Sequence, residues 1–137
     1  MRLDIALDER LPHPPERVWQ ALTDAATICG WLMATNDFRP EVGARFKLKT
    51  EHLSPTGWID AEVLELDPPR RMVWAWSSND GNPPSRVTFE LEPENGGSRL
   101  RLTHEGEIEP AIGAILVEGW PGRIDALAKA AARKEET

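Results

Sequence analysis

Alternating apolar and polar residues predict β-strands along much of the chain. Near the start, Leu3, Ile5 and Leu7 are separated by Asp4 and Ala6. A period of two residues is typical of a strand with one buried face. The same alternation predicts strands at residues 45–51, 57–66, 71–76, 86–91 and 99–104. Turn residues separate the later segments, so we expect an antiparallel meander with one apolar face.

Apolar residues at helical spacing predict two short helices after the first strand. Val18 and Leu22 follow a Pro-rich turn, and proline is favoured in the first turn of a helix. This spacing predicts a helix from residue 15 to about residue 22. Asp24 is a suitable N-cap for a second helix over residues 25–31.

A longer apolar stripe predicts one long helix near the end of the chain, from about residue 111 to residue 133. Its members recur at a period of about 3.6 residues; they are Ile112, Ile115, Leu116, Gly119, Trp120, Arg123, Leu127 and Ala131. Pro121 lies inside this segment. Proline lacks the N–H that would donate to the Val117 carbonyl, so we expect it to interrupt and kink the helix.

This order of elements predicts an α+β domain. A curved antiparallel sheet of six or seven strands must bury its apolar face, and the C-terminal helix is the only long element able to cover it. The two short helices after the first strand would close one end. The chain has 137 residues, of which 40% are hydrophobic, and a domain of this size buries a sizeable core. We therefore expect residues 1–137 to form a single domain.

Charge and hydropathy narrow the class of protein. The formal net charge is −7 at pH 7, which argues against binding to nucleic acid or to an anionic membrane. No apolar run approaches the roughly 18 residues of a membrane span, and the first residues lack the apolar core of a signal peptide. We expect a cytoplasmic protein that does not insert into membranes. Cys29, the only cysteine, excludes an internal disulfide and is predicted to be a small core residue.

Several motifs, taken in order, resemble one superfamily. They are PERVWQALTD at residues 15–24 with Trp31 after it, FRPEVGARF at 38–46, VLELDPPRRMVWAW at 63–76, VTFEL at 87–91, LRLTHEG at 100–106 and Gly119-Trp120. Together they cover nearly the whole chain and resemble the START-like superfamily, also called SRPBCC or Bet v 1-like. The second and third motifs are similar to its AHSA-type branch, named after homologues of the activator of the heat-shock chaperone ATPase.

The resemblance implies a helix-grip fold. In this fold a curved antiparallel sheet wraps around the long C-terminal helix and a hydrophobic cavity lies between them. The wider superfamily includes lipid carriers, hormone receptors and polyketide cyclases. The resemblance therefore implies a place for a ligand and leaves the activity open.

His104 is the first candidate for chemistry in that space. It shares strand parity with Leu100 and Leu102, so its side chain should point inward. It could serve as a polar handle or proton donor in the cavity; we favour the alternative of a hydrogen-bonded core histidine. His13 and His52 are expected to be exposed. No metal-binding motif is present, so we predict no metal site and no cofactor.

Glu62 is the second candidate, as a general base. If it and Asp60 faced inward, Glu62 would be a buried carboxylate of the kind that enzymes use in proton transfer. If Ile59, Ala61 and Val63 face inward instead, both acids are solvated. We favour the second arrangement, because that alternate set is wholly apolar.

Aromatic residues are the remaining signal. The chain has six Trp and three Phe but no Tyr. Their rings could pack solidly, or they could leave a cleft for a flat apolar ligand. The residues predicted to line a ligand cavity are Trp31, Phe46, Trp58, Trp74, Trp76, Phe89, His104, Leu116 and Trp120.

Three functions are consistent with these patterns. We favour a binding protein that encloses a small hydrophobic or aromatic molecule without covalent chemistry. The alternatives are an enzyme of the cyclase or lyase kind, using His104 or Glu62, and a protein-interaction module such as a chaperone regulator or a homodimer. An ionisable group inside an open cavity would favour the enzyme. A filled cavity with an exposed apolar patch would favour the interaction module.

Overall fold

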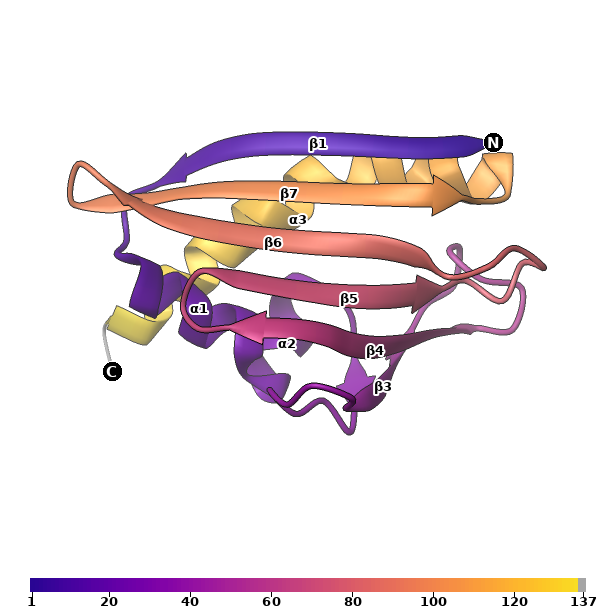
Figure 1. Cartoon of the computed structure of the whole chain (residues 1–137), viewed down its shortest axis with the longest axis horizontal. Helices are drawn as coiled ribbons and strands as arrows, with labels where there is room; N and C mark the ends of the chain where they lie inside the picture. Colours follow the sequence, from indigo (N-terminus) through magenta and orange to yellow (C-terminus); the bar gives the residue numbers. More distant parts are fainter. Residues whose placement is uncertain (136–137) are drawn as a thin grey trace.

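The computed structural model, which describes residues 1–135, contains one antiparallel sheet of seven strands in the order β1-β7-β6-β5-β4-β3-β2 (Figure 1). The strands are β1 (Arg2–Leu11), β2 (Thr35–Asn36), β3 (Arg45–Lys49), β4 (Trp58–Asp67), β5 (Arg71–Ser77), β6 (Ser85–Glu94) and β7 (Gly97–Glu107). The predicted meander corresponds to β4 to β7. Strand β2 was not predicted, because two residues are too few to show a period.

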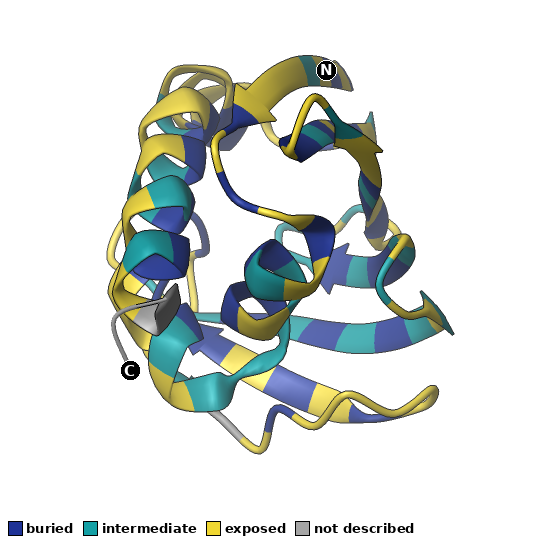
Figure 2. Ribbon diagram, turned by 90° about the vertical axis from the view of Figure 1, so that its left-hand side faces the viewer, coloured by how far each residue is buried: buried dark blue, intermediate teal, exposed yellow. Residues whose placement is uncertain are grey.

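Three helices cover one face of this sheet. They are α1 (Pro15–Thr23), α2 (Ala25–Trp31) and α3 (Pro110–Glu135). Helix α3 crosses behind β1, β7 and β6, and the two short helices lie behind the other half of the sheet (Figure 1). The buried side of α3 is turned towards the interior and its other side towards solvent (Figure 2). The predicted α+β helix-grip fold is therefore confirmed.

Pro121 does not interrupt α3, as the sequence had suggested it would. The helix continues through it to Glu135. Pro121 is exposed, and so is Val117, whose carbonyl loses its usual donor. Both residues lie on the solvent side of the helix, so water can donate to this carbonyl in place of the missing N–H.

The outer face of the sheet carries pairs of opposite charges between neighbouring strands. Lys47 Nζ lies 2.6 Å from Asp60 Oδ1, and Arg45 Nε lies 3.1 Å from Glu62 Oε1. The hydrogen bond from Lys47 lowers the pKa of Asp60. Ala61, which lies between these two acids in the chain, is buried on the other face, as is Ile59. The favoured arrangement, with both acids solvated, is thus confirmed, and Glu62 does not reach the interior.

Three other expectations about single residues are wrong. Cys29 is exposed, because it lies on the solvent side of α2 while Ile28 and Trp31 face the core. His13 is buried, since the segment after β1 folds back and its carbonyl accepts a hydrogen bond of 2.6 Å from Ser98 Oγ. Ile115, placed in the core stripe of α3 by its spacing, is 40% exposed at the edge of that stripe.

Candidate functional site

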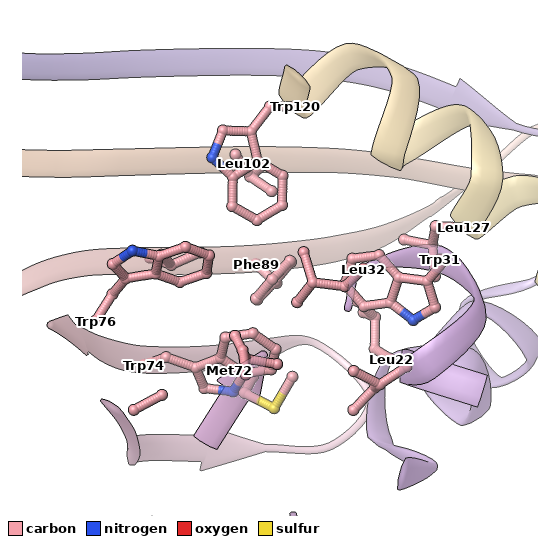
Figure 3. Close-up of a cluster of buried hydrophobic side chains, with 14 of the residues drawn as sticks. Leu22, Trp31, Leu32, Met72, Trp74, Trp76, Phe89, Leu102, Trp120 and Leu127 are labelled. Atoms are coloured by element: carbon pink, nitrogen blue, oxygen red, sulfur yellow. The ribbon is translucent and has the colours of Figure 1, made fainter. Parts of the chain in front are cut away.

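A cluster of aromatic side chains fills the space between the sheet and the helices (Figure 3). Strand β5 supplies Trp74 and Trp76, since residues two apart share one face of a strand. Phe89 comes from β6, Trp120 from α3 and Trp31 from α2. The ring centroids lie 4.9 Å apart for Trp74–Phe89, 5.9 Å for Trp76–Trp120 and 6.2 Å for Trp31–Phe89. All five side chains are at most 2% exposed.

A second group of rings surrounds Trp74 on its other side. Phe46 of β3 lies 5.0 Å from Trp74 and 5.0 Å from Phe38 between ring centroids. Phe38 belongs to the segment between β2 and β3 and covers this part of the cluster, with its ring 6.0 Å from Trp74. Phe38 was not predicted to line the cavity, because it belongs to no strand and so has no strand parity that would show which way it points. The sequence feature that could have pointed to Phe38 was its position at the start of the FRPEVGARF motif, residues 38–46.

The Trp74 indole N–H is buried and has no hydrogen-bond partner. The indole N–H groups of the other tryptophans in the cluster are all satisfied. Trp31 donates to the Ala21 carbonyl at 2.9 Å, Trp76 to Ser78 Oγ at 3.2 Å and Trp120 to His104 Nδ1 at 3.1 Å. A buried donor without an acceptor costs about 1–3 kcal/mol, so Trp74 is the one polar group of this cluster with an unused interaction.

His104 lies in the middle of a chain of hydrogen bonds. Trp120 donates to its Nδ1, so the ring proton must be on Nε2, which donates to Ser85 Oγ at 2.8 Å. Ser85 in turn donates to the Trp76 carbonyl at 3.1 Å. His104 is completely buried, and this burial lowers its pKa to about 3. His104 points inward as predicted, and it is a hydrogen-bonded core histidine whose two nitrogens are both engaged.

The structure brings together all but one of the residues predicted to line a cavity. Leu116 is buried in the same core as the aromatic cluster, on α3. Trp58 is the exception: it is half-buried and shares the outer face of β4 with Asp60. Trp58 is next to Ile59 in the strand, and neighbouring strand residues point to opposite faces. The sequence therefore already indicated that Trp58 lies on the outer face once Ile59 was placed inside.

A hollow of about 550 Å³ lies elsewhere, on the outer face of the sheet. The charged side chains that line it include Lys47, Asp60, Arg45 and Glu62, which already pair with one another. Within residues 1–135, no three His, Cys, Asp or Glu side chains lie close enough together to hold a metal ion. Among the polar groups of the aromatic cluster, the Trp74 N–H is therefore the one that is free to bind a partner.

The helix-grip architecture and this buried aromatic cluster define a START-like domain. The chain belongs to the family of Activator of Hsp90 ATPase homolog 1-like proteins, whose model matches residues 12–132. The sequence resemblance to the AHSA-type branch is thereby confirmed. No helix among the described residues is both long and apolar enough to span a membrane.

Several solved structures share this fold. Protein MLL2253 from Mesorhizobium loti is 30% identical, with 95% of this chain and 97% of that chain covered and a TM-score of 0.81. CalU16 from Micromonospora echinospora is 27% identical, with coverages of 97% and 78% and a TM-score of 0.75. DynU16, from the dynemicin biosynthetic locus, is 20% identical and shares the fold, with coverages of 92% and 46% and a TM-score of 0.73. No curated protein matches the chain.

Proposed function

We propose that the protein binds a small, flat, largely apolar molecule that carries one hydrogen-bond acceptor, and that it does so without covalent chemistry. The main support for this proposal is the buried N–H of Trp74, which has no hydrogen-bond partner in the protein. Ligand sites in proteins combine apolar and aromatic walls with a few polar groups that fix the orientation of the ligand. Trp74 supplies such a polar group, and Phe38, Phe46 and Phe89 supply the walls around it.

Binding at Trp74 requires a side chain to move, because aromatic rings occupy the space around the indole. Phe38 is the ring best placed to do so. It lies on the connection between β2 and β3, whereas Phe46 and Phe89 lie within paired strands. A flat ligand that takes the place of the Phe38 ring would keep the edge-to-face contacts with Phe46 and Trp74. The acceptor atom of the ligand could then accept a hydrogen bond from the Trp74 indole N–H.

The two alternative functions have less support. An enzyme of the cyclase or lyase kind would need a free acid or base, but both nitrogens of His104 are engaged and Glu62 lies on the outer face. An interaction module would need an exposed apolar patch. The large apolar side chains that are exposed include Val42, Ile115 and Val117, and the last two lie on opposite flanks of α3.

The test compares two naphthalenes of nearly equal size by isothermal titration calorimetry. β-Naphthyl methyl ketone has an acceptor, and β-ethylnaphthalene has none. We expect the wild-type protein to bind the ketone more tightly. Trp74→Phe should weaken ketone binding by about 3- to 10-fold more than it weakens ethylnaphthalene binding, because only the ketone loses a hydrogen bond.

Trp58→Phe is the matched control, because it makes the same chemical change on the outer face of the sheet. It should alter neither affinity. The proposal would be overturned if neither naphthalene bound the wild-type protein, or if Trp58→Phe and Trp74→Phe weakened ketone binding equally.

A further inference from the structure

Strand β1 forms one edge of the sheet, and its outer side is open. It is ten residues long and pairs with β7 over its whole length without a register shift. No other described strand or helix lies beyond it (Figure 1). The opposite edge is β2, which has only two residues. Very short strands, bulges and prolines prevent an edge from pairing with another chain, and β1 has none of these three features.

The backbone groups at the free edge of β1 can be assigned residue by residue. At its start, the Met1 amino group donates to the Ile108 carbonyl and the Ile108 N–H donates to the Met1 carbonyl, each at 3.0 Å. Such mutual bonds recur at every second residue of an antiparallel pair, so the odd-numbered residues of β1 face β7. The Leu11 carbonyl keeps this phase, since its oxygen would lie 2.3 Å from a Cβ atom on Gly97 of β7. The even-numbered residues therefore direct N–H and C=O groups to the free edge; they are Arg2, Asp4, Ala6, Asp8 and Arg10.

Two charged side chains of this even-numbered set lie opposite like charges on β7. Asp4 lies opposite Glu105, and Arg10 lies opposite Arg99. Arg10 has a diagonal partner, because its Nε lies 3.2 Å from Glu94 Oε2. Asp4 has no ion pair within residues 1–135, unlike the other charged residues of the set. Like charges opposite each other are destabilising, so Asp4 would gain from a cation across the free edge and Arg10 from an anion.

A second copy of the same strand supplies both of these charges. Two β1 strands can pair antiparallel with Leu7 of one copy opposite Leu7 of the other. Asp4 of each copy then lies opposite Arg10 of its partner, and the free N–H and C=O groups of the two strands meet. A register centred on Ala6 would instead place Asp4 opposite Asp8. Charges protect an edge when they repel an incoming strand, but in the register centred on Leu7 they attract one.

Leu7 favours this register over one centred on Ile5, which would also bring opposite charges together. In that register the acid that gains a partner is Asp8, which already pairs with Arg99, and Asp4 gains none. Leu7 is half-buried in the single chain, whereas Ile5 is buried. Side chains lie closest in the pairs that share no backbone hydrogen bond, so the two Leu7 side chains would cover each other at the centre of the register.

We infer that β1 is a homodimer interface, in which two copies of the chain join edge to edge into one continuous sheet about a two-fold axis at Leu7. Backbone hydrogen bonds supply the affinity in this mode of association, so it needs no exposed apolar patch. The interface is self-complementary, as a two-fold axis requires, because each copy offers both Asp4 and Arg10. This assembly goes beyond the proposed function and does not depend on a ligand at Trp74.

Charge reversal tests the interface by sedimentation velocity over a range of protein concentrations. We expect the wild-type protein to dimerise. Asp4→Arg should weaken dimerisation at least about tenfold, because two pairs of arginines would face each other in every dimer. Arg10→Asp should have the same effect, and the double variant should restore dimerisation because it only exchanges the two charges. A wild-type protein that stays monomeric, or a double variant as weak as the single ones, would overturn the inference.

Ala6→Pro tests the backbone bonds themselves. It removes an N–H at the free edge and no bond to β7, and proline is tolerated where the N–H of an edge strand faces solvent. This variant should lose the dimer. Ala6→Val is the matched control, since it enlarges the same side chain but keeps the N–H, and it should dimerise like the wild type. Equal dimerisation of the two variants would contradict the interface.

Amide hydrogen exchange followed by NMR locates the interface without mutation. The amides of Asp4, Ala6 and Asp8 should exchange rapidly in dilute protein and become protected in concentrated protein. The amides of Ile5 and Leu7, which bond to β7, should be protected in both. A dimer whose even-numbered amides stay unprotected would use another surface and would overturn the inference. So would a chain that remains monomeric by itself and pairs only with a foreign extended peptide.

Discussion

Lowering the pH from 6.5 to about 4.5 should reduce the free energy of unfolding by about 2 kcal/mol through His104 alone. The pKa of this histidine is about 3 in the folded protein, against an ordinary value of 6.5. The unfolded chain binds about half a proton more than the folded protein at pH 6.5, and nearly one more at about pH 5.5 and below, until His104 itself titrates. Stability therefore falls as the pH falls, by about 1.4 kcal/mol per pH unit. Urea unfolding at a series of pH values measures this slope.

His104→Gln supplies the comparison. At pH 7 it should lower stability by about 2–4 kcal/mol, because the Trp120 N–H loses its buried acceptor and the chain of bonds through Ser85 is broken. Its stability should then be flat between pH 6.5 and about 4.5. The carboxyls of Asp8 and Asp60 have a pKa that is lowered in the folded protein from the ordinary value of 3.8. Their contribution to stability is therefore lost mainly below about pH 4.5, outside the range in which His104 acts. His52→Gln, at an exposed position, should keep the wild-type slope; an equal slope in His104→Gln would refute the assignment.

Adding one methyl group at Gly97 should destabilise the protein by about 3 kcal/mol. Gly97 begins β7, where a Cβ atom would lie 2.3 Å from the Leu11 carbonyl oxygen and 3.3 Å from Pro12 Cα. Both neighbours are backbone atoms, so the clash can be relieved only by moving the end of β1 away from β7. Urea unfolding of Gly97→Ala should show this loss.

Gly122→Ala makes the same chemical change with the opposite expected sign. Gly122 is an exposed residue in α3, and a Cβ atom there meets nothing within 4 Å. Alanine is favoured over glycine inside a helix by about 1 kcal/mol, so this variant should be slightly more stable than the wild type. If both alanine variants changed stability alike, the close approach of β1 to β7 at Gly97 would be contradicted.

The elements themselves could be predicted from local pattern. The second short helix was placed at residues 25–31, which are its observed bounds. The strand parity of residues 59–63 and of His104 was also predicted correctly, because alternation along a strand is a property of the backbone. Trp58 was misplaced when its aromatic character was given more weight than its parity. Cys29 was misplaced because a short helix without a strong stripe does not define its buried side.

The sequence by itself determined that this chain forms a sheet with one apolar face, two short helices and a long helix that covers it. It also determined that His104 faces the interior. Only the tertiary structure decided which polar groups find partners there. The donor to His104 Nδ1, Trp120, comes from 16 residues away, and the Leu32 carbonyl that accepts a hydrogen bond from Arg123 Nη1 lies 91 residues away. The unpaired N–H of Trp74 is what these long-range contacts leave without a partner, so no local pattern could have revealed it.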